Sequence, residues 1–475
     1  MRLTLILVVL SFFFSSLVAQ DHQWFYEIHE EYREASLEDR FFTHSDVEPL
    51  IVNLKDHPDF EVNLEGESVQ GRSIYLVKWG SGPKKVYLWT QMHGNEPTAT
   101  MAVADIFNFL ASDENEEIKE ELAEKVTLLF LPMVNPDGAE VYKRRNALDV
   151  DLNRDAQRLQ SPESVILKDV RDRYNPDFGF NLHDQSLYYG AGFSGKPVAI
   201  AFLAPAYNQE REVNKQRLNA MKLIAQLNEI VQEYAPGKVA KFSDAFEPRA
   251  FGDNMQRWGT STILIESGGY RDDPEKQYLR KLHFTILMSS FFSIADGDFK
   301  NYSREAYESI PANRISIFDL VIRNAEVELP EGTFVLDLGY RDHIVFGDGH
   351  VGSPEIGPRL VDVGDLSTFG AYTEYDASGF TLKQGEIWPE VFKSSEELAN
   401  SIWAERLQEG YTYFRLDGPI PESLQRIMPF VVLGPEEERP EFPMLGKNAA
   451  LLMEKQGEYR YIVANGRMHN LVLFR

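Results

Sequence analysis

Short hydrophobic runs alternate with helical patterns between residues 69 and 299. Apolar and β-branched runs predict six buried strands, at residues 74–79, 86–90, 126–134, 178–182, 198–203 and 261–265. Apolar residues at helical spacing predict three helices, at residues 97–110, 217–234 and 274–295. This alternation is typical of a sheet covered on both faces. We therefore predict an α/β domain over residues 21–300.

The pattern changes after residue 302, where helical spacing largely stops. Alternating or β-branched runs predict strands at residues 315–327, 333–338, 411–416, 429–433 and 459–463. Asn465-Gly466 stands between two apolar segments and predicts a hairpin turn. We predict a linker at residues 301–313, which are rich in Asn, Ser and Pro, and a mostly β accessory domain at residues 314–475.

The first twenty residues have the layout of a secretory signal peptide. Arg2 precedes an apolar run at residues 3–14, small residues follow, and the chain turns polar at Gln20. The run is short for a membrane span, although an uncleaved anchor is the alternative. We expect cleavage of residues 1–20, a periplasmic or secreted protein, and no membrane contact afterwards.

Charge and composition exclude several classes of function. The chain has 48 Lys and Arg against 74 Asp and Glu, a net charge of −26, which argues against nucleic acid as a partner. Cysteine is absent, which excludes thiol catalysis, Cys-ligated zinc and disulfides. A transition metal must therefore be bound by His and carboxylates.

Candidate metal ligands follow the predicted strand at residues 86–90. His93 and Glu96 are three residues apart, and Pro97 stands where a helix would begin. A turn of this kind can direct an imidazole and a carboxylate to one point. Both groups are suitable zinc ligands if a third ligand comes from elsewhere in the chain.

Further polar motifs follow strands or turns, where open α/β sheets build ligand sites. They are Asn135-Pro136-Asp137-Gly138, Arg144-Arg145, Asp151-Leu152-Asn153-Arg154, His183 and Glu266. In this order, and together with His93 and Glu96, they resemble the zinc metallocarboxypeptidase family of carboxypeptidase A/E-like peptidases over residues 60–300. The resemblance implies a mixed central sheet flanked by helices.

The resemblance also implies one Zn²⁺ per chain and a ligand set. His93, Glu96 and His183 match the zinc ligands, which leaves a fourth position for water. Asp151 matches the carboxylate that accepts the other ring N–H of the first ligand. The remaining eight histidines have no comparable context, and we expect them not to be ligands.

Four further residues match catalytic or substrate-binding positions of the family. Glu266 matches the general base, and Arg144 the cation that stabilises the oxyanion. Arg145 is the alternative to Arg144, but the spacing to Asp151 favours Arg144. Asn153 and Arg154 match the pair that binds the free C-terminal carboxylate of a peptide.

The implied function is zinc-dependent hydrolysis of the C-terminal peptide bond. Zinc-dependent deacylation of N-acyl amino acids is the alternative, since such enzymes share the His-Gly-Asn-Glu and Asp-Leu-Asn-Arg segments; a catalytically dead binding protein is less consistent with intact ligands. The loop at residues 242–251 departs from the family because it contains no Tyr, and Arg249 is a candidate replacement. Residues 186–196 either line the substrate groove or pack internally, and residues 250–262 are expected to shape the specificity pocket.

Overall fold

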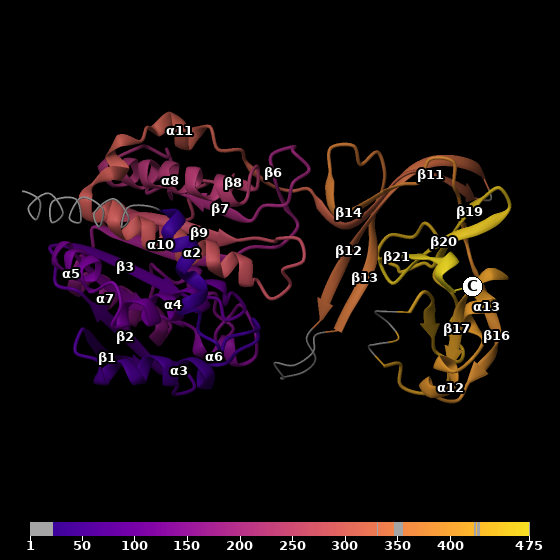
Figure 1. Ribbon diagram of the computed structural model, residues 1–475, viewed down its shortest axis with the longest axis horizontal. Helices are drawn as coiled ribbons and strands as arrows, with labels where there is room; N and C mark the ends of the chain where they lie inside the picture. Colours follow the sequence, from indigo (N-terminus) through magenta and orange to yellow (C-terminus); the bar gives the residue numbers. More distant parts are fainter. Residues whose placement is uncertain (1–21, 330, 346–354, 422–423, 425–427, 475) are drawn as a thin grey trace, which may run out of the picture. The chain divides into compact units, whose positions relative to one another are not determined.

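The computed structural model describes residues 22–329, 331–345, 355–421, 424 and 428–474. The predicted signal peptide, residues 1–20, lies outside the described residues. The chain divides into two compact units (Figure 1). One consists of residues 1–192 and 197–315, and the other of residues 193–196 and 316–475.

An eight-stranded mixed sheet forms the centre of the first unit, in the order β1-β2-β4-β3-β5-β9-β7-β8. The four pairs β4–β3, β3–β5, β5–β9 and β7–β8 are parallel, and the other three are antiparallel. The strands are β1 Phe60–Glu67, β2 Ser73–Trp79, β3 Lys84–Thr90, β4 Val126–Leu131, β5 Phe178–Asp184, β7 Ile200–Leu203, β8 Val239–Lys241 and β9 Ser261–Ser267. The predicted α/β fold with a mixed sheet is confirmed.

Helices pack on both faces of this sheet because its central strands are apolar on both sides. Val86 and Leu88 of β3 face one core, which contains residues of α2, α4, α5, α8 and α10. Tyr87 and Trp89 face a second core, formed with α7 and α9. The helices are α2 His22–Tyr32, α3 His44–Asn53, α4 Thr98–Ala111, α5 Glu116–Lys125, α6 Pro136–Glu140, α7 Pro162–Tyr174, α8 Lys215–Tyr234, α9 Phe251–Arg257, α10 Gln277–Asp296 and α11 Arg304–Glu308.

Some boundaries differ from the predicted ones for local reasons. The run at residues 126–134 leaves the sheet after Leu131, and Met133 adopts a left-handed conformation with φ 54°. Residues 301–313, expected to be a linker, contain α11, whose N-cap Ser303 accepts a hydrogen bond from the Ala306 amide. Tyr307 of this helix is buried, and its hydroxyl accepts from the amide of Ala204. This segment therefore packs within the first unit.

The second unit is mostly β, as predicted. One sheet has the order β13-β12-β11-β15-β19-β20-β21, with β14 paired to β11, and a second has the order β16-β17-β18. The predicted turn at Asn465-Gly466 joins β20 to β21, and both residues have positive φ, as a two-residue hairpin requires. The elements are β11 Ile317–Leu329, β12 Gly332–Val345, β13 Glu355–Gly364, β14 Gly370–Asp376, β15 Thr381–Gln384, β16 Glu386–Phe392, β17 Tyr411–Leu416, β18 Val431–Leu433, β19 Leu451–Lys455, β20 Glu458–Ala464 and β21 Arg467–Asn470, with the short helices α12 Ser395–Ala399 and α13 Trp403–Gln408.

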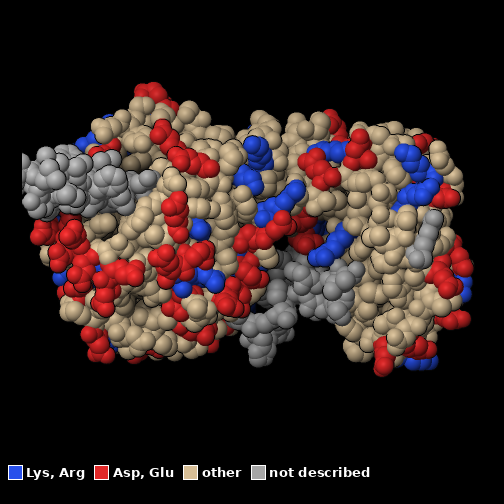
Figure 2. All heavy atoms as spheres, viewed as in Figure 1, with Lys and Arg blue, Asp and Glu red and all other residues tan. Residues whose placement is uncertain are grey.

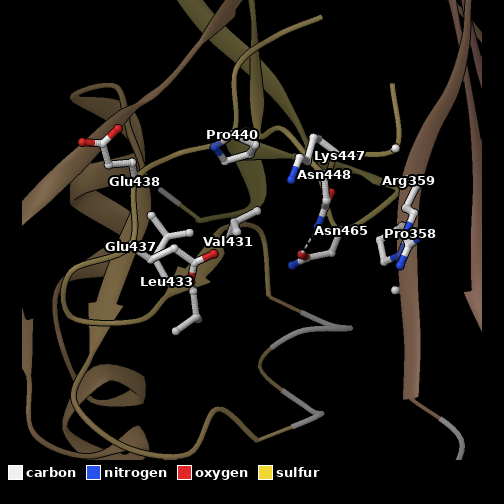
Figure 3. A pocket seen from close by; sticks show the side chains of 13 residues that line it. Pro358, Arg359, Val431, Leu433, Glu437, Glu438, Pro440, Lys447, Asn448 and Asn465 are labelled. Carbon is white, nitrogen blue, oxygen red and sulfur yellow. Dashed lines mark hydrogen bonds between the residues drawn. The ribbon is translucent and has the colours of Figure 1, made fainter. Parts of the chain in front are cut away.

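A cavity of about 340 Å³ lies within the second unit (Figure 3). Asn465 at the turn lines it and donates to the carbonyls of Met428 and Phe430, while its own side-chain oxygen accepts from Asn448. These hydrogen bonds connect the β20–β21 hairpin to the segment before β18. Among the described residues, no helix is long and apolar enough to cross a membrane.

Candidate active site

Three candidate metal ligands converge at the ends of two adjacent parallel strands. His93 and Glu96 lie in the turn between β3 and α4, and His183 is the second-last residue of β5. One ligand atom from each residue lies within 4.8 Å of the others, and all three side chains are buried. Pro97 is the N-cap of α4, so the helix begins one residue later than predicted.

The two imidazoles are oriented alike around Glu96. Nδ1 of His93 lies 2.9 Å from one carboxylate oxygen of Glu96, and Nδ1 of His183 lies 2.6 Å from the other. The opposite ring nitrogens face Asp151 at 3.0 Å and Asn153 at 3.5 Å. Burial opposes ionisation of Glu96, but the two imidazoles outweigh it and hold its pKa well below the usual value. Two Nδ1 atoms and a carboxylate, with a carboxylate acceptor at the outer nitrogen of His93, suit a transition metal.

Asp151 connects the metal ligands to Arg144. Burial opposes ionisation of Asp151, while its hydrogen bond to His93 and the nearby Arg144 lower its pKa below the usual range. The Nε of Arg144 donates to Asp151 at 3.2 Å, and Nη1 donates to Glu96 at 3.1 Å. Arg145 instead donates to the backbone carbonyl of Asp149. Of the two candidate arginines, the structure therefore places Arg144 beside the ligands.

Glu266 lies on β9, directly opposite His183 in the register between β5 and β9. Its side chain lines the same cavity as the metal ligands. Burial, together with the charges of Glu96 and Asp184, raises the pKa of Glu266 well above the usual value. The carboxylate predicted to be the general base is thus next to the candidate metal centre.

Arg154 and Asn153 lie on the other side of the cavity, in a short 3-10 turn that Asp151 caps. The side-chain oxygen of Asn153 accepts from the amide of Phe251 at 2.9 Å, which connects this turn to α9. The Nη1 of Arg154 donates to the carbonyl of Asn153 at 2.6 Å. Its Nε lies 3.5 Å from the carboxylate of Glu247, so an acidic side chain already faces this guanidinium.

The motifs did not reveal several other residues at the site. Glu247 also accepts two hydrogen bonds from the guanidinium of Arg249, at 3.0 and 3.1 Å, and one from its backbone amide, at 3.1 Å. Arg249 is not among the residues that line the cavity. Asp253 lines the cavity, and burial raises its pKa to about 6. Asp184 forms an ion pair of 3.0 Å with Lys276. The spacing of residues in the sequence gave no indication of these contacts, because they lie in an irregular loop or join segments that are distant in sequence.

The cavity enclosed by these residues has a volume of about 370 Å³. Ser186 and Tyr189 line it, so the loop at residues 186–196 contributes to the groove. Ala250 and Asp253 line it from the segment predicted to shape specificity. Tyr189 and Glu266 line the same cavity, and burial together with the charge of Glu266 raises the pKa of Tyr189.

Residues 48–215 match the model of the zinc carboxypeptidase family. This match confirms the resemblance drawn from the motifs. Carboxypeptidase 2 of Trichophyton tonsurans is 31% identical over 139 residues, which cover 29% of this chain and 25% of the relative. Carboxypeptidase SOL1 of Arabidopsis thaliana is 30% identical over 98 residues, 19% of this chain and 20% of the relative. The matched segment thus spans a quarter or less of these relatives.

Solved structures of metallocarboxypeptidases are also similar to the chain. One from Burkholderia cenocepacia has a TM-score of 0.43 and 18% identity, over 54% of this chain and 70% of that chain. One from Pseudomonas aeruginosa, in complex with (2-guanidinoethylmercapto)succinic acid, has a TM-score of 0.41 and 20% identity, over 53% and 69% of the respective chains.

Proposed function

We propose that the protein is a zinc-dependent carboxypeptidase that removes the C-terminal residue of peptides. The observation that carries the proposal is the convergence, in one cavity, of the buried group His93, Glu96 and His183 with Glu266 and Arg154. The match to the family over residues 48–215 supports the same reading. The predicted signal peptide supports action in the periplasm or outside the cell.

His93, Glu96 and His183 would hold one Zn²⁺ per chain. The metal, when bound, supplies a Lewis acid that polarises a water molecule and the scissile carbonyl. Asp151 accepts from the outer nitrogen of His93 and so fixes the tautomer that leaves Nδ1 free for a metal. His93 is therefore presented in the protonation state that metal binding requires.

The other residues divide the remaining tasks. Glu266 takes a proton from the attacking water and later delivers it to the leaving amine. Arg144 is next to the ligands and stabilises negative charge on the carbonyl oxygen in the transition state. Asn153 and Arg154 bind the free carboxylate of the terminal residue, and a guanidinium suits that task because it donates two parallel hydrogen bonds.

One peptide, in free-acid and C-terminally amidated forms, tests this proposal. Wild-type protein should prefer the free acid, because an amide brings no negative charge to the Arg154 guanidinium. Arg154→Ala should lower kcat/KM for the free acid, with a loss of about 2–5 kcal/mol of transition-state stabilisation, as for one partner of a charge pair that the bound substrate buries. Equal wild-type rates on both forms would contradict recognition of a terminal carboxylate.

Deacylation of N-acyl amino acids is the alternative on this scaffold, and the assay separates the two. A deacylase would hydrolyse N-acetyl amino acids and leave longer peptides intact, whereas a carboxypeptidase would act on longer peptides. Chelation should abolish either activity, and added zinc should restore it. A rate that chelation leaves unchanged would contradict both zinc-dependent readings.

A further inference from the structure

A second cavity adjoins the candidate active site at Arg144. Its volume is about 450 Å³, and Gln70, Lys143, Arg145 and Asp149 are among the residues that line it. Arg144 lines both this cavity and the one that contains the metal ligands. We refer to the second cavity as the basic pocket. Arg154 lines only the first cavity, so the basic pocket is separate from the predicted site of the terminal carboxylate.

Three consecutive cations, Lys143, Arg144 and Arg145, give the basic pocket its charge. Arg144 forms ion pairs with Asp151 and Glu96. Among the described residues, no carboxylate lies within 4.0 Å of the charged groups of Lys143 or Arg145. Lys143 and Arg145 thus flank Arg144 without an acidic partner, in a chain of net charge −26. Among the charged side chains that Figure 2 shows on the visible face of the first unit, acidic ones predominate.

The lining carboxylates do not neutralise these cations. Asp137 is fully buried and forms an ion pair of 2.7 Å with Arg72, and it also accepts from Ser68 and from the amide of Gln70. Its charge is therefore already compensated. Asp149 contributes one carboxylate to the pocket, against the two unpaired cations Lys143 and Arg145.

The backbone that carries the cations is held in place. The amide of Lys143 donates to the carbonyl of Gly138 at 2.8 Å. The side-chain oxygen of Asn146 accepts from the amides of Leu148 and Val150, and its nitrogen donates to Glu163. The pocket is thus preorganised, which lowers the entropic cost of binding a charged group.

We propose that the basic pocket binds acidic side chains of the substrate, at the residues that precede the scissile bond. The inference rests on the proposed function. The residue to be released occupies the cavity with Arg154, so the rest of the peptide leaves the metal centre in another direction. The basic pocket shares Arg144 with the cavity of the metal ligands, and its unpaired cations favour Asp or Glu there. Peptides with acidic residues before the C-terminal residue are the substrate class.

Two peptides that differ only in charge test the inference: acetyl-Glu-Glu-Phe and acetyl-Gln-Gln-Phe. Wild type should have a kcat/KM about tenfold higher for the Glu peptide, which is the size expected of one or two partly exposed charge pairs, about 1.4 kcal/mol. High salt should reduce this ratio. The double variant Lys143→Glu, Arg145→Glu should reverse the preference.

A matched control is the double variant Lys168→Glu, Arg173→Glu, which changes the net charge equally. Lys168 and Arg173 are on α7 and already have the partners Asp172 and Glu65. The control should keep the wild-type preference, and circular dichroism should show both variants folded. A reversal in the control as well would mean that overall charge, and not the basic pocket, sets the preference.

Calorimetric binding of the product-like dipeptides acetyl-Glu-Glu and acetyl-Gln-Gln gives a readout that does not require turnover. Wild type should bind acetyl-Glu-Glu about tenfold more tightly, and the Lys143→Glu, Arg145→Glu variant should lose this difference. Equal affinities in wild type, or equal rates on the two tripeptides, would overturn the inference while leaving the carboxypeptidase proposal intact. Failure to hydrolyse either tripeptide would instead overturn the proposed function, and the binding ratio would still decide the role of the pocket.

Discussion

Glu266 lines the cavity but does not belong to the cluster of three candidate metal ligands. It is the proposed general base. Glu266→Gln keeps the size of the side chain and removes its ability to accept a proton. We expect the variant to retain stoichiometric zinc while kcat falls by ~10²–10⁴-fold, the usual contribution of general acid–base catalysis. Metal analysis and steady-state kinetics on one preparation check this. Loss of zinc from the variant would indicate that Glu266 is a ligand instead.

The carboxylate of Glu247 lies 3.5 Å from the guanidinium of Arg154, so the proposed binding of a substrate carboxylate by Arg154 predicts competition from Glu247. Glu247→Gln keeps the size of the side chain and one acceptor oxygen for Arg249, and it removes the competing charge. We expect KM for a free-acid peptide to fall about fivefold, as for a partly exposed ion pair, with kcat unchanged. The amidated peptide is the control and should show no change. An unchanged KM for the free acid would mean that Glu247 does not compete.

The sequence could predict that residues of one short motif lie close together. It could not predict contacts between distant segments. His93 and Glu96 share one turn, so their spacing indicated a common target. Glu247 meets Arg154 only because the segment before α9 folds back over the 3-10 turn. The spacing to Asp151 favoured Arg144 over Arg145, and in the structure it is Arg144 that donates to Asp151 and Glu96.

At the scale of elements, strands could be predicted from hydrophobic runs, but their order could not. β3, β5 and β9 are adjacent in the sheet, so their carboxyl ends bring His93, His183 and Glu266 together. The helices α2 and α3 were not predicted. The position of α2 depends on distant residues, since His29 and Arg280 both bind the buried carboxylate of Asp105.

His283 on α10 makes the packing of β9 sensitive to acid. It is fully buried beside the hydroxyl of Ser267, at 2.7 Å, and burial lowers its pKa to about 4. The folded protein therefore binds a proton at His283 less readily than the unfolded chain does, so acid favours unfolding. Stability should fall as the pH drops from about 6.5 to about 4, by up to ~3 kcal/mol.

Chemical denaturation of wild type and His283→Gln at several pH values measures this contribution. The difference between the two unfolding free energies should shrink towards pH 4, because glutamine does not titrate. Using the difference removes the effect of other groups, such as Asp253, whose raised pKa acts in the opposite direction over the same range. A difference that is constant with pH would contradict a neutral, buried His283.

At the scale of the whole molecule, each unit has hydrophobic clusters of its own. Residues of the sheet and helices form those of the first unit, and residues of β11 to β20 form those of the second. The change of pattern after residue 302 predicted two regions because helical and strand periodicities differ. It could not predict the function of the second unit, since its strands carry packing residues and no recognisable catalytic motif.

Separate cores predict that metal binding stabilises only one of the two units. All three candidate ligands belong to the first unit. Differential scanning calorimetry of the full chain should show two transitions, and zinc should raise only one of them. A free zinc concentration of about 1,000 times Kd adds about 4 kcal/mol to the unit that binds it. His93→Ala and His183→Ala should each abolish the shift, because two ligands do not define the site. A single transition, or equal shifts of both, would show that the two cores do not unfold independently.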